Sequence, residues 1–167
     1  MFTFVPEYYF NTFDEVDADF LVSIGVKGIV LDIDNTLEPY EHPKAGERVI
    51  RWIDSLYLQG IKTAIVSNNN EKRVNLFNED FNMPAYARGG KPFKRNVENA
   101  IKDMGITKSE AILMGDQIFT DVWAAHNAGI PAILVPPIND KKDALTKFKR
   151  LLEKPILRTF KRKVGRK

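Results

Sequence analysis

The sequence alternates short apolar runs with segments of helical periodicity, and this alternation constrains the fold more than any other feature. The apolar runs are rich in β-branched residues and end in polar or turn-forming residues, as buried strands do. We expect strands at 28–33, 61–67, 110–116 and 130–137, helices at 42–60, 68–80, 92–105 and 120–129, and an irregular segment at 85–92. Strand–helix alternation with short links predicts an α/β fold, in which helices cover both faces of a parallel sheet.

Size and composition set the broad class of the protein. At 167 residues the chain is long enough for one domain, and its apolar content of 44% is that of an ordinary globular protein. The absence of cysteine excludes disulfides and thiolate metal sites and is consistent with a reducing compartment. No apolar run reaches the roughly 18 residues that a membrane span needs, and residues 1–17 lack a signal-peptide pattern. We therefore expect a cytoplasmic protein.

Polar residues that suit phosphate or metal chemistry follow the predicted strands or lie in the loops between them. They are Asp32, Asp34, Ser67, Asn68, Lys91 and Asp116. In open α/β sheets, ligands bind at the carboxyl ends of the strands. One polar strand end means little, but several that converge on one edge predict a site.

Asp32 and Asp34 raise the sharpest question. Side chains two residues apart in a strand point to one face, where two carboxylates repel each other unless a cation or a substrate lies between them. Asp32 is predicted to be a nucleophile that attacks phosphorus and forms an aspartyl phosphate. Asp34 is predicted to be the general acid for the leaving alcohol and then the general base for water. The alternative for this pair taken alone is a capped turn or a solvated pair of acids.

Other polar residues suit the same chemistry. Asp116 directly follows a buried strand and is a candidate oxygen ligand for Mg²⁺. Asp121, in the first turn of the next helix, either supports the metal or Lys91, or simply favours the helix dipole. Lys91 is suited to neutralise phosphoryl oxygens, with a solvated surface lysine as the alternative. Ser67, with Asn68 beside it, is suited to bind phosphate oxygens, with a helix cap as the alternative.

The stretches DIDNT, VSNNN, GGKP and GDQIFTD, in this order within residues 28–137, resemble the four motifs of the haloacid dehalogenase (HAD) phosphatase superfamily. The resemblance implies a single three-layer Rossmann-like domain and Mg²⁺-dependent phosphatase chemistry. Dehalogenases of the superfamily lack an aspartate two residues after the nucleophile, so the resemblance favours phosphoryl transfer. The residues implied are Asp32 as nucleophile, Asp34 as acid/base, Ser67 as phosphate-binding hydroxyl, Lys91 as neutralising lysine, and Asp116 with Asp121 as the Mg²⁺-holding acids, aided by Asp32 and the backbone carbonyl of Asp34.

The gaps between these motifs are too short for a cap domain. From Asp34 to Ser67, and from Ser67 to Lys91, the chain has room only for the helices and links already assigned. An open site cannot easily enclose a small metabolite and exclude water. It suits a phosphate displayed on something large, such as a lipid head group, a protein or a nucleic acid.

Two segments flank the predicted motifs. We expect a phosphatase domain at 1–140, with the aromatic segment 1–25 packed on it either as a cover for the core or as an interfacial anchor. Residues 141–167 carry twelve Lys/Arg and two acids, with apolar residues at helical spacing. A basic amphipathic segment is typical of contact with an anionic membrane surface or partner, and would place the protein peripherally at the inner face of the membrane. The alternative is a helix packed on the sheet, followed by a solubilising tail.

Within the superfamily, the chain most resembles the capless YqeG subfamily over nearly its whole length. That subfamily is similar to the phosphatases that act on phosphatidylglycerophosphate, which makes this lipid the candidate substrate. A soluble phosphatase for a nucleotide, a sugar phosphate or a phosphoprotein is the first alternative. An RNA-, ribosome- or protein-binding module with vestigial activity is the second, although nucleic acid is the less favoured partner. The oligomeric state stays open, as do the roles of His42, Arg88, Lys94 and Arg95, while His126 is expected to be structural or on the surface.

Overall fold

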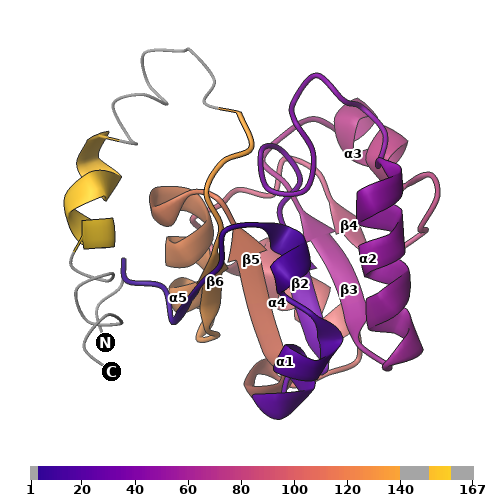
Figure 1. Cartoon of the computed structure of the whole chain (residues 1–167), viewed down its shortest axis with the longest axis horizontal. Coiled ribbons are helices and arrows are strands. Elements are labelled where there is room, and N and C mark those ends of the chain that lie inside the picture. The colour runs from indigo at the N-terminus through magenta and orange to yellow at the C-terminus, as the bar shows by residue number, and fades with distance from the viewer. Residues whose placement is uncertain (1–3, 140–150, 159–167) are drawn as a thin grey trace.

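A six-stranded sheet forms the centre of the computed structural model, which describes residues 4–139 and 151–158 (Figure 1). Its strand order is β1-β6-β5-β2-β3-β4, and every neighbouring pair is parallel. The strands are β1 Tyr8–Tyr9, β2 Gly28–Leu31, β3 Lys62–Val66, β4 Ala85–Tyr86, β5 Ala111–Gly115 and β6 Ala132–Leu134. The carboxyl ends of β2, β3 and β5 therefore lie side by side.

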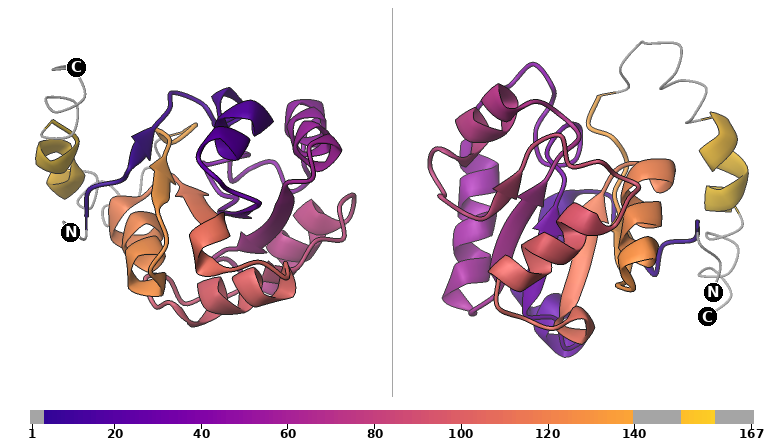
Figure 2. Two further views of the ribbon diagram at one scale, coloured as in Figure 1. Left: turned by 90° about the horizontal axis from the view of Figure 1, so that it is seen from below. Right: turned by 180° about the vertical axis from the view of Figure 1, so that it is seen from behind.

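Helices cover both faces of this sheet, as the turned views show (Figure 2). On one face lie α1 Ala18–Ser23, α2 Glu47–Leu58 and α3 Glu71–Asn78, and on the other α4 Arg95–Asp103 and α5 Trp123–Ala128. Successive β2 residues serve opposite faces, because Ile29 and Leu31 join the first core while Val30 joins the second. The predicted three-layer α/β domain is confirmed.

The helix α2 illustrates how the sequence pattern becomes packing. Its buried residues are Val49, Trp52, Ile53 and Leu56, which is the helical spacing of one apolar face. Burial of each large apolar side chain contributes roughly 2 kcal/mol. The Trp52 indole N–H also donates to the Val16 carbonyl at 2.8 Å, so the polar atom of this side chain is satisfied. The contact ties α2 to the segment just before α1.

Both edges of the sheet differ from the sequence-based expectation. The segment 85–92 was expected to be irregular, but Ala85 and Tyr86 pair with Ile65 and Val66 of β3 as the edge strand β4. At the other edge, β1 arises from the aromatic N-terminal segment. Each of these strands has only two residues, which is too short for an alternating pattern to reveal it.

Several other element boundaries differ too, among them that of α2, which begins at Glu47 rather than at 42. Helix α4 begins at Arg95 rather than at 92, because the chain first makes a turn in which Phe93 N–H donates to the Gly90 carbonyl. Strand β6 ends at Leu134 rather than at 137, since the prolines that follow Val135 have no N–H to donate to a ladder. The helix expected at 120–129 begins earlier, with a single π-helical turn, Ile118–Val122, that leads into α5.

The described residues hold no cap domain. Between Asp34 and Ser67 the only helix is α2, and between Ser67 and Lys91 the chain forms α3 and β4. Among the N-terminal aromatics, Phe13 is buried in the core and Phe10 packs against Phe20. Within residues 4–139 and 151–158, no helix is long and apolar enough to cross a membrane.

The predicted basic segment 141–167 lies largely outside the described residues. Its part at 151–158 is helical. Ile156 and Leu157 of this helix pack against the core on the side of α5. The helix 151–158 therefore packs on the sheet domain. A packed helix in this segment was the alternative to a membrane-contacting one.

Candidate active site

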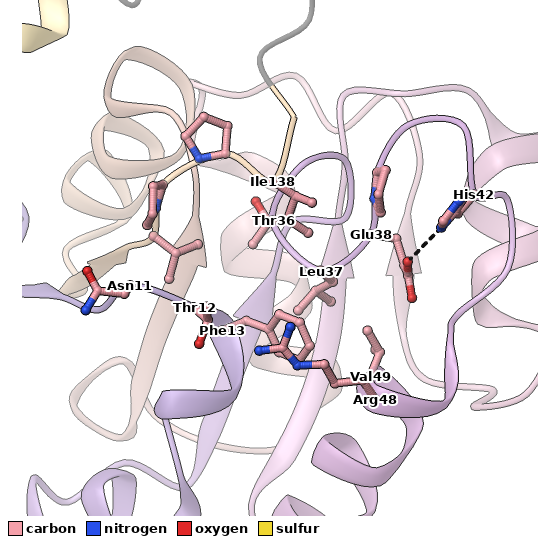
Figure 3. Close-up of a pocket in the computed structure, with 14 residues that line it drawn as sticks. Asn11, Thr12, Phe13, Thr36, Leu37, Glu38, His42, Arg48, Val49 and Ile138 are labelled. Atoms are coloured by element: carbon pink, nitrogen blue, oxygen red, sulfur yellow. Dashed lines mark ion pairs between the residues drawn. The ribbon is translucent and has the colours of Figure 1, made fainter.

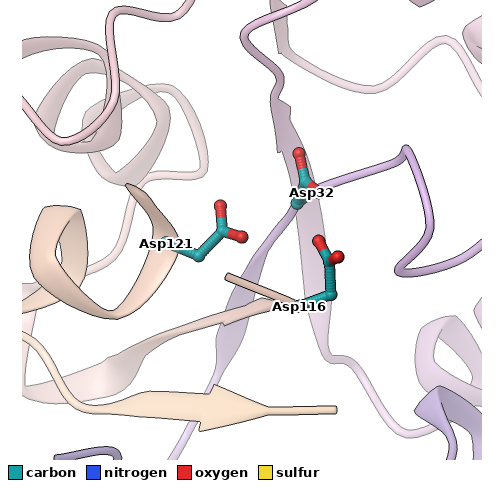
Figure 4. A group of neighbouring side chains, drawn as sticks. All are labelled: Asp32, Asp116 and Asp121. Carbon is teal, nitrogen blue, oxygen red and sulfur yellow. The ribbon is translucent and has the colours of Figure 1, made fainter. Parts of the chain in front are cut away.

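Three aspartates converge beside the carboxyl ends of the central strands (Figure 4). Asp32 follows β2, Asp116 follows β5, and Asp121 projects from the π-helical turn toward both. All three are buried, and one carboxylate oxygen from each lies within 4.8 Å of the others. The sheet topology creates this group, because β2 and β5 are direct neighbours in register from Gly28 and Ala111 onward.

Lys91 supplies the positive charge of this group. Its ammonium lies 2.8 Å from Asp32 Oδ1 and 2.5 Å from Asp121 Oδ1, and its side chain is only 3% exposed. Burial alone would lower the pKa of Lys91, but the charges of Asp121 and Asp32 outweigh burial and raise this pKa above its usual range. Burial raises the pKa of Asp121 to about 6, against the opposing effect of Lys91. Lys91 is therefore a fixed cation in a buried cluster of acids.

Thr36 links two of the acids and was not singled out from the sequence. Its hydroxyl lies 3.0 Å from Asp32 Oδ2 and 3.1 Å from Asp116 Oδ1. A hydroxyl has one proton and can donate to only one of these oxygens at a time. The Thr36 hydroxyl thus holds the two carboxylates at a fixed spacing.

Gly115 gives Asp121 the room it occupies. A Cβ at this position would come within 2.2 Å of the Asp121 carboxyl carbon, so a larger residue cannot be accommodated there without moving the acid. The Asp121 carboxylate also accepts from the Gln117 N–H at 3.0 Å through Oδ2. Both roles considered for Asp121 occur together, since one oxygen contacts Lys91 and the other caps its own turn.

Asp34 is held by two donors outside the acidic group. Asn69 Nδ2 donates to its Oδ2 at 2.7 Å, and Arg73 Nε donates to its Oδ1 at 2.9 Å. Arg73 is buried and also donates to the Pro43 carbonyl, so its guanidinium fixes both the acid and the loop that follows it. Sequence analysis missed Arg73 and Asn69 in this role, although their place one turn apart at the start of α3 could have been a signal.

Ser67 and Asn68 occupy the end of β3, as predicted, but their contacts differ. Ser67 is buried, and its hydroxyl accepts from the Asn69 N–H at 3.2 Å. The Asn68 side chain exchanges two hydrogen bonds with the backbone of Lys91, at 3.0 Å and 2.9 Å. Asn68 thus positions the lysine loop, while both residues still line the cavity described next.

The site opens into a cavity of about 350 Å³. Its lining is polar and comes from four strand-end segments: Asp32, Asp34, Ser67, Asn68, Asn69, Lys91, Gln117, Thr120 and Asp121. Every sequence-predicted site residue except Asp116 lines this cavity, and one carboxylate oxygen of Asp116 lies within 4.8 Å of oxygens of Asp32 and Asp121, which do line it. The structure thus brings all seven predicted residues together.

A second cavity, of about 360 Å³, lies on the other side of the loop after β2 (Figure 3). Its wall is mostly apolar and includes Phe13, Leu37, Val49 and Val135. At this cavity, His42 pairs with Glu38 at 3.5 Å (Figure 3). The structure therefore gives His42 no contact with the predicted site residues.

Two further contacts fall outside the predicted site. His126 is buried against Glu7, at 3.1 Å, and so joins α5 to the N-terminal segment, in agreement with the structural role expected for it. Glu153 of the helix 151–158 is also buried, and its carboxylate accepts from the Ile118 N–H at 2.9 Å. Glu153 thus caps the turn that carries Asp121, a contact that sequence analysis did not anticipate.

The donor set fits a hard divalent cation. Carboxylate oxygens are the ligands that such cations prefer, and metal–oxygen bonds of about 2.1 Å in an octahedral site place opposite oxygens roughly 4.2 Å apart. The 4.8 Å span of Asp32, Asp116 and Asp121 is close to that spacing.

An α/β sheet with an aspartate, a lysine and further acids at its strand ends suits phosphoryl chemistry, and comparison with known proteins identifies the class of protein. The sequence profile of the haloacid dehalogenase-like hydrolases matches residues 26–135, so the chain belongs to this family. A curated relative, "Probable phosphatase YqeG" of Bacillus subtilis (strain 168), is 36% identical over 160 residues, which cover 96% of this chain and 93% of the relative. The chain is accordingly a HAD-family phosphatase of the YqeG type.

Solved structures share the fold. An uncharacterized protein from Listeria monocytogenes serotype 4b matches with a TM-score of 0.54 and 19% identity, over 77% of this chain and 99% of that one. The cobalt-bound form of the deoxy-D-mannose-octulosonate 8-phosphate phosphatase from Haemophilus influenzae matches with a TM-score of 0.51 and 12% identity, over 78% of this chain and 88% of that one. At these identities the likeness establishes the architecture alone.

Proposed function

We propose that the protein is a Mg²⁺-dependent phosphomonoester hydrolase that works through an aspartyl phosphate on Asp32. The observation that carries this proposal is the buried contact of Lys91 with both Asp32 and Asp121 at the floor of a polar cavity. A fixed cation beside a carboxylate nucleophile is what attack on an anionic phosphoryl group requires. The family match supports the same class of reaction.

In the first step, a carboxylate oxygen of Asp32 attacks phosphorus and the bond from phosphorus to the ester oxygen breaks. Lys91 faces the developing charge on the phosphoryl oxygens, and the Ser67 hydroxyl with nearby backbone N–H groups binds them. Asp34, in its protonated form, gives its proton to the leaving alkoxide. The products are an alcohol and the aspartyl phosphate.

In the second step, water attacks the phosphorus of the aspartyl phosphate. Asp34 takes a proton from that water, the bond from phosphorus to Asp32 breaks, and inorganic phosphate leaves. Both contacts of Asp34 come from donors, Asn69 and Arg73, an arrangement suited to the base form that this step needs. The proton that Asp34 takes up in this step is the one that it gives to the leaving group in the next turnover.

Mg²⁺ would be held by Asp32, Asp116 and the backbone carbonyl of Asp34, with Asp121 close by, and when bound it supplies charge that stabilises the phosphoryl oxygens. The buried oxygens of the three aspartates support this placement. Thr36 fixes the spacing of Asp32 and Asp116 before any cation binds.

The substrate we propose is a phosphate displayed on a membrane lipid, with phosphatidylglycerophosphate as the candidate. The described chain places no cap over the cavity, so a bulky substrate can present its phosphate from outside. The same openness argues against a small metabolite, because nothing in residues 4–139 encloses one and excludes bulk water.

The test is phosphate release from phosphatidylglycerophosphate in mixed micelles, with and without Mg²⁺, beside a panel of soluble phosphate esters. Asp32→Asn is the blank. We expect Mg²⁺-dependent release that prefers the lipid and is abolished in Asp32→Asn. Release from soluble esters alone would retain the mechanism and overturn the substrate, and release that persists in Asp32→Asn would overturn the mechanism.

A further inference from the structure

A phenylalanine stands exposed at the rim of the site. Phe93 follows the buried Lys91 by two residues, yet it is 75% exposed. Its backbone is well fixed, because the Phe93 N–H donates to the Gly90 carbonyl at 2.8 Å and Asn96 Nδ2 donates to the Gly89 carbonyl at 3.0 Å. One short segment therefore holds a lysine inside the site and displays an aromatic ring outside it.

Cationic residues lie on both sides of Phe93 in the sequence. Arg88, Lys94 and Arg95 are all exposed, and no acid lies between residues 81 and 97. Among the described residues Arg88 and Arg95 make no ion pair, and Lys94 only approaches Glu98 at 3.4 Å on the surface, a weak contact. Arg88 also has a left-handed backbone (φ 46°), held by its N–H to the Asn69 carbonyl at 2.7 Å.

An exposed aromatic ring close in sequence to exposed cations is typical of a surface that binds anionic lipid. The ring enters the boundary between head groups and acyl chains, while the cations contact the head groups. Residues 1–140 as a whole carry more acids than bases, so the patch is a local exception within them. Phe93 follows Lys91, which lines the cavity, by only two residues, so the patch is next to the site along the chain.

We propose that Phe93, Arg88, Lys94 and Arg95, here called the Phe93 rim, form a docking surface for an anionic lipid bilayer. Docking would bring lipid phosphates to the cavity that Asp32 and Lys91 line. This inference deepens the proposed function and rests on it where it assigns the docked lipid as substrate. Binding itself is independent of turnover and can be tested alone.

Leu58 provides a matched control for Phe93. It is 86% exposed and ends α2, four residues before β3 begins. It therefore lies near the amino-terminal end of β3, whereas the site lies at the carboxyl ends of the strands. We would measure co-sedimentation of the full chain with vesicles of phosphatidylcholine alone and of phosphatidylcholine with phosphatidylglycerol. Phe93→Ala should weaken binding to the anionic vesicles roughly ten-fold, whereas Leu58→Ala should leave it unchanged.

A second pair of variants reports insertion directly. Phe93→Trp should show a blue-shifted emission increment on addition of anionic vesicles, and Leu58→Trp should show none. The cations are tested by Arg88→Gln with Arg95→Gln, which should weaken binding and reduce its dependence on salt. Equal vesicle binding by Phe93→Ala and wild type, or equal emission shifts for the two tryptophan variants, would overturn the proposal.

The outcomes also separate this proposal from the proposed function. Phe93-dependent vesicle binding without hydrolysis of any lipid phosphate would retain the docking surface and overturn the lipid substrate. If Phe93→Ala weakens binding to a single-stranded RNA oligonucleotide but not to vesicles, the rim binds nucleic acid by stacking and the lipid assignment is wrong. Where both hold, the ratio of lipid to soluble-ester hydrolysis should fall about ten-fold in Phe93→Ala.

Discussion

Two cavities of nearly equal volume, about 350 Å³ and 360 Å³, flank the loop that follows β2, but their linings differ. The first gathers Asp32, Lys91 and Asp121 in direct contact, while the second is walled mainly by apolar side chains and prolines. Size alone does not distinguish them. What makes the first a site for phosphoryl chemistry is that buried charges face one another across it, so that an anion and a cation both find partners there.

The same contrast appears in the cations of the two cavities. Lys91 is buried between two acids, whereas Arg48 at the apolar cavity is mostly exposed and pairs with Asp14 on the surface. An exposed ion pair contributes little to stability because water screens it. A buried charge is tolerated only because its partner is present, so loss of that partner strongly destabilises the fold. Substitutions at matched positions should therefore have very different effects.

Lys91→Met should have the largest effect. It leaves Asp32 and Asp121 buried without a cation, so we expect the free energy of unfolding to fall by about 3 kcal/mol and turnover to fall at least about 100-fold. Added Mg²⁺ should restore part of the stability but not the turnover. Chemical denaturation with and without Mg²⁺ measures the first, and phosphate release the second.

Arg48→Met is the control for that change. It removes an exposed cation beside the apolar cavity and should cost less than about 1 kcal/mol with turnover retained. Equal losses of stability in the two variants would contradict the distinction between the cavities.

Arg73→Lys should have the next largest effect. It keeps a charge but loses the planar group that contacts both Asp34 and the Pro43 carbonyl. We expect kcat to fall roughly ten-fold with KM nearly unchanged, because Asp34 is misplaced rather than the substrate weakened. Arg51→Lys, on the exposed face of α2, is the control. A raised KM with kcat intact would make Arg73 a substrate-binding residue instead.

Thr36→Val tests the candidate metal site, and Thr12→Val at the apolar cavity is its control. It removes the hydroxyl between Asp32 and Asp116 while keeping the side-chain shape. We expect the affinity for Mg²⁺, measured by calorimetry, to fall roughly five-fold, with a stability change of about 1 kcal/mol. Thr12→Val, at the apolar cavity, loses only a contact to Asp14 and should leave Mg²⁺ affinity unaltered. Equal Mg²⁺ affinities in both variants would exclude a role for Thr36 at the metal site.

Glu7→Gln should have the smallest effect, confined to stability, because this acid lies outside both cavities. Burial raises the pKa of Glu7, but His126 and the Ala132 N–H outweigh burial and lower it. Because its pKa is lowered in the folded state, the Glu7 carboxylate stabilises the fold at pH values above the ordinary glutamate pKa of roughly 4.3. This stabilisation is lost as the pH falls below that value and through the lower pKa of the folded state. The difference in unfolding free energy between wild type and Glu7→Gln should therefore be about 1 kcal/mol at pH 7 and shrink below pH 4. A difference that does not change with pH would contradict this assignment.

The central strands could be predicted from sequence, whereas the sheet edges could not. Runs such as 28–31 are apolar throughout because both faces of the strand are buried, and this pattern can be recognised without knowing the neighbouring strands. Tyr8–Tyr9 and Ala85–Tyr86 are strands only because β6 and β3 offer them a partner. Their two-residue length carries no period that sequence analysis could detect.

A similar division holds within the candidate site. Residues such as Asp32, Ser67 and Asp116 directly follow strands, so the parallel topology alone predicts that they lie near one another. The partners that fix the acids are different, because Thr36 reaches Asp116 and Arg73 reaches Asp34 across long stretches of chain. Such contacts depend on how loops and helices pack, which the local pattern does not encode.

The central claim is that Asp32 carries the phosphoryl group during turnover. Borohydride reduces an acyl phosphate to an alcohol, so quenching the enzyme with borohydride during turnover of a phosphate ester should convert Asp32 to homoserine. We predict that peptide mass spectrometry finds this product at position 32, that it requires both substrate and Mg²⁺, and that it accumulates in Asp34→Asn, in which the second step is slowed. Turnover with no modification at position 32, or with reduction of a different acid, would contradict the account.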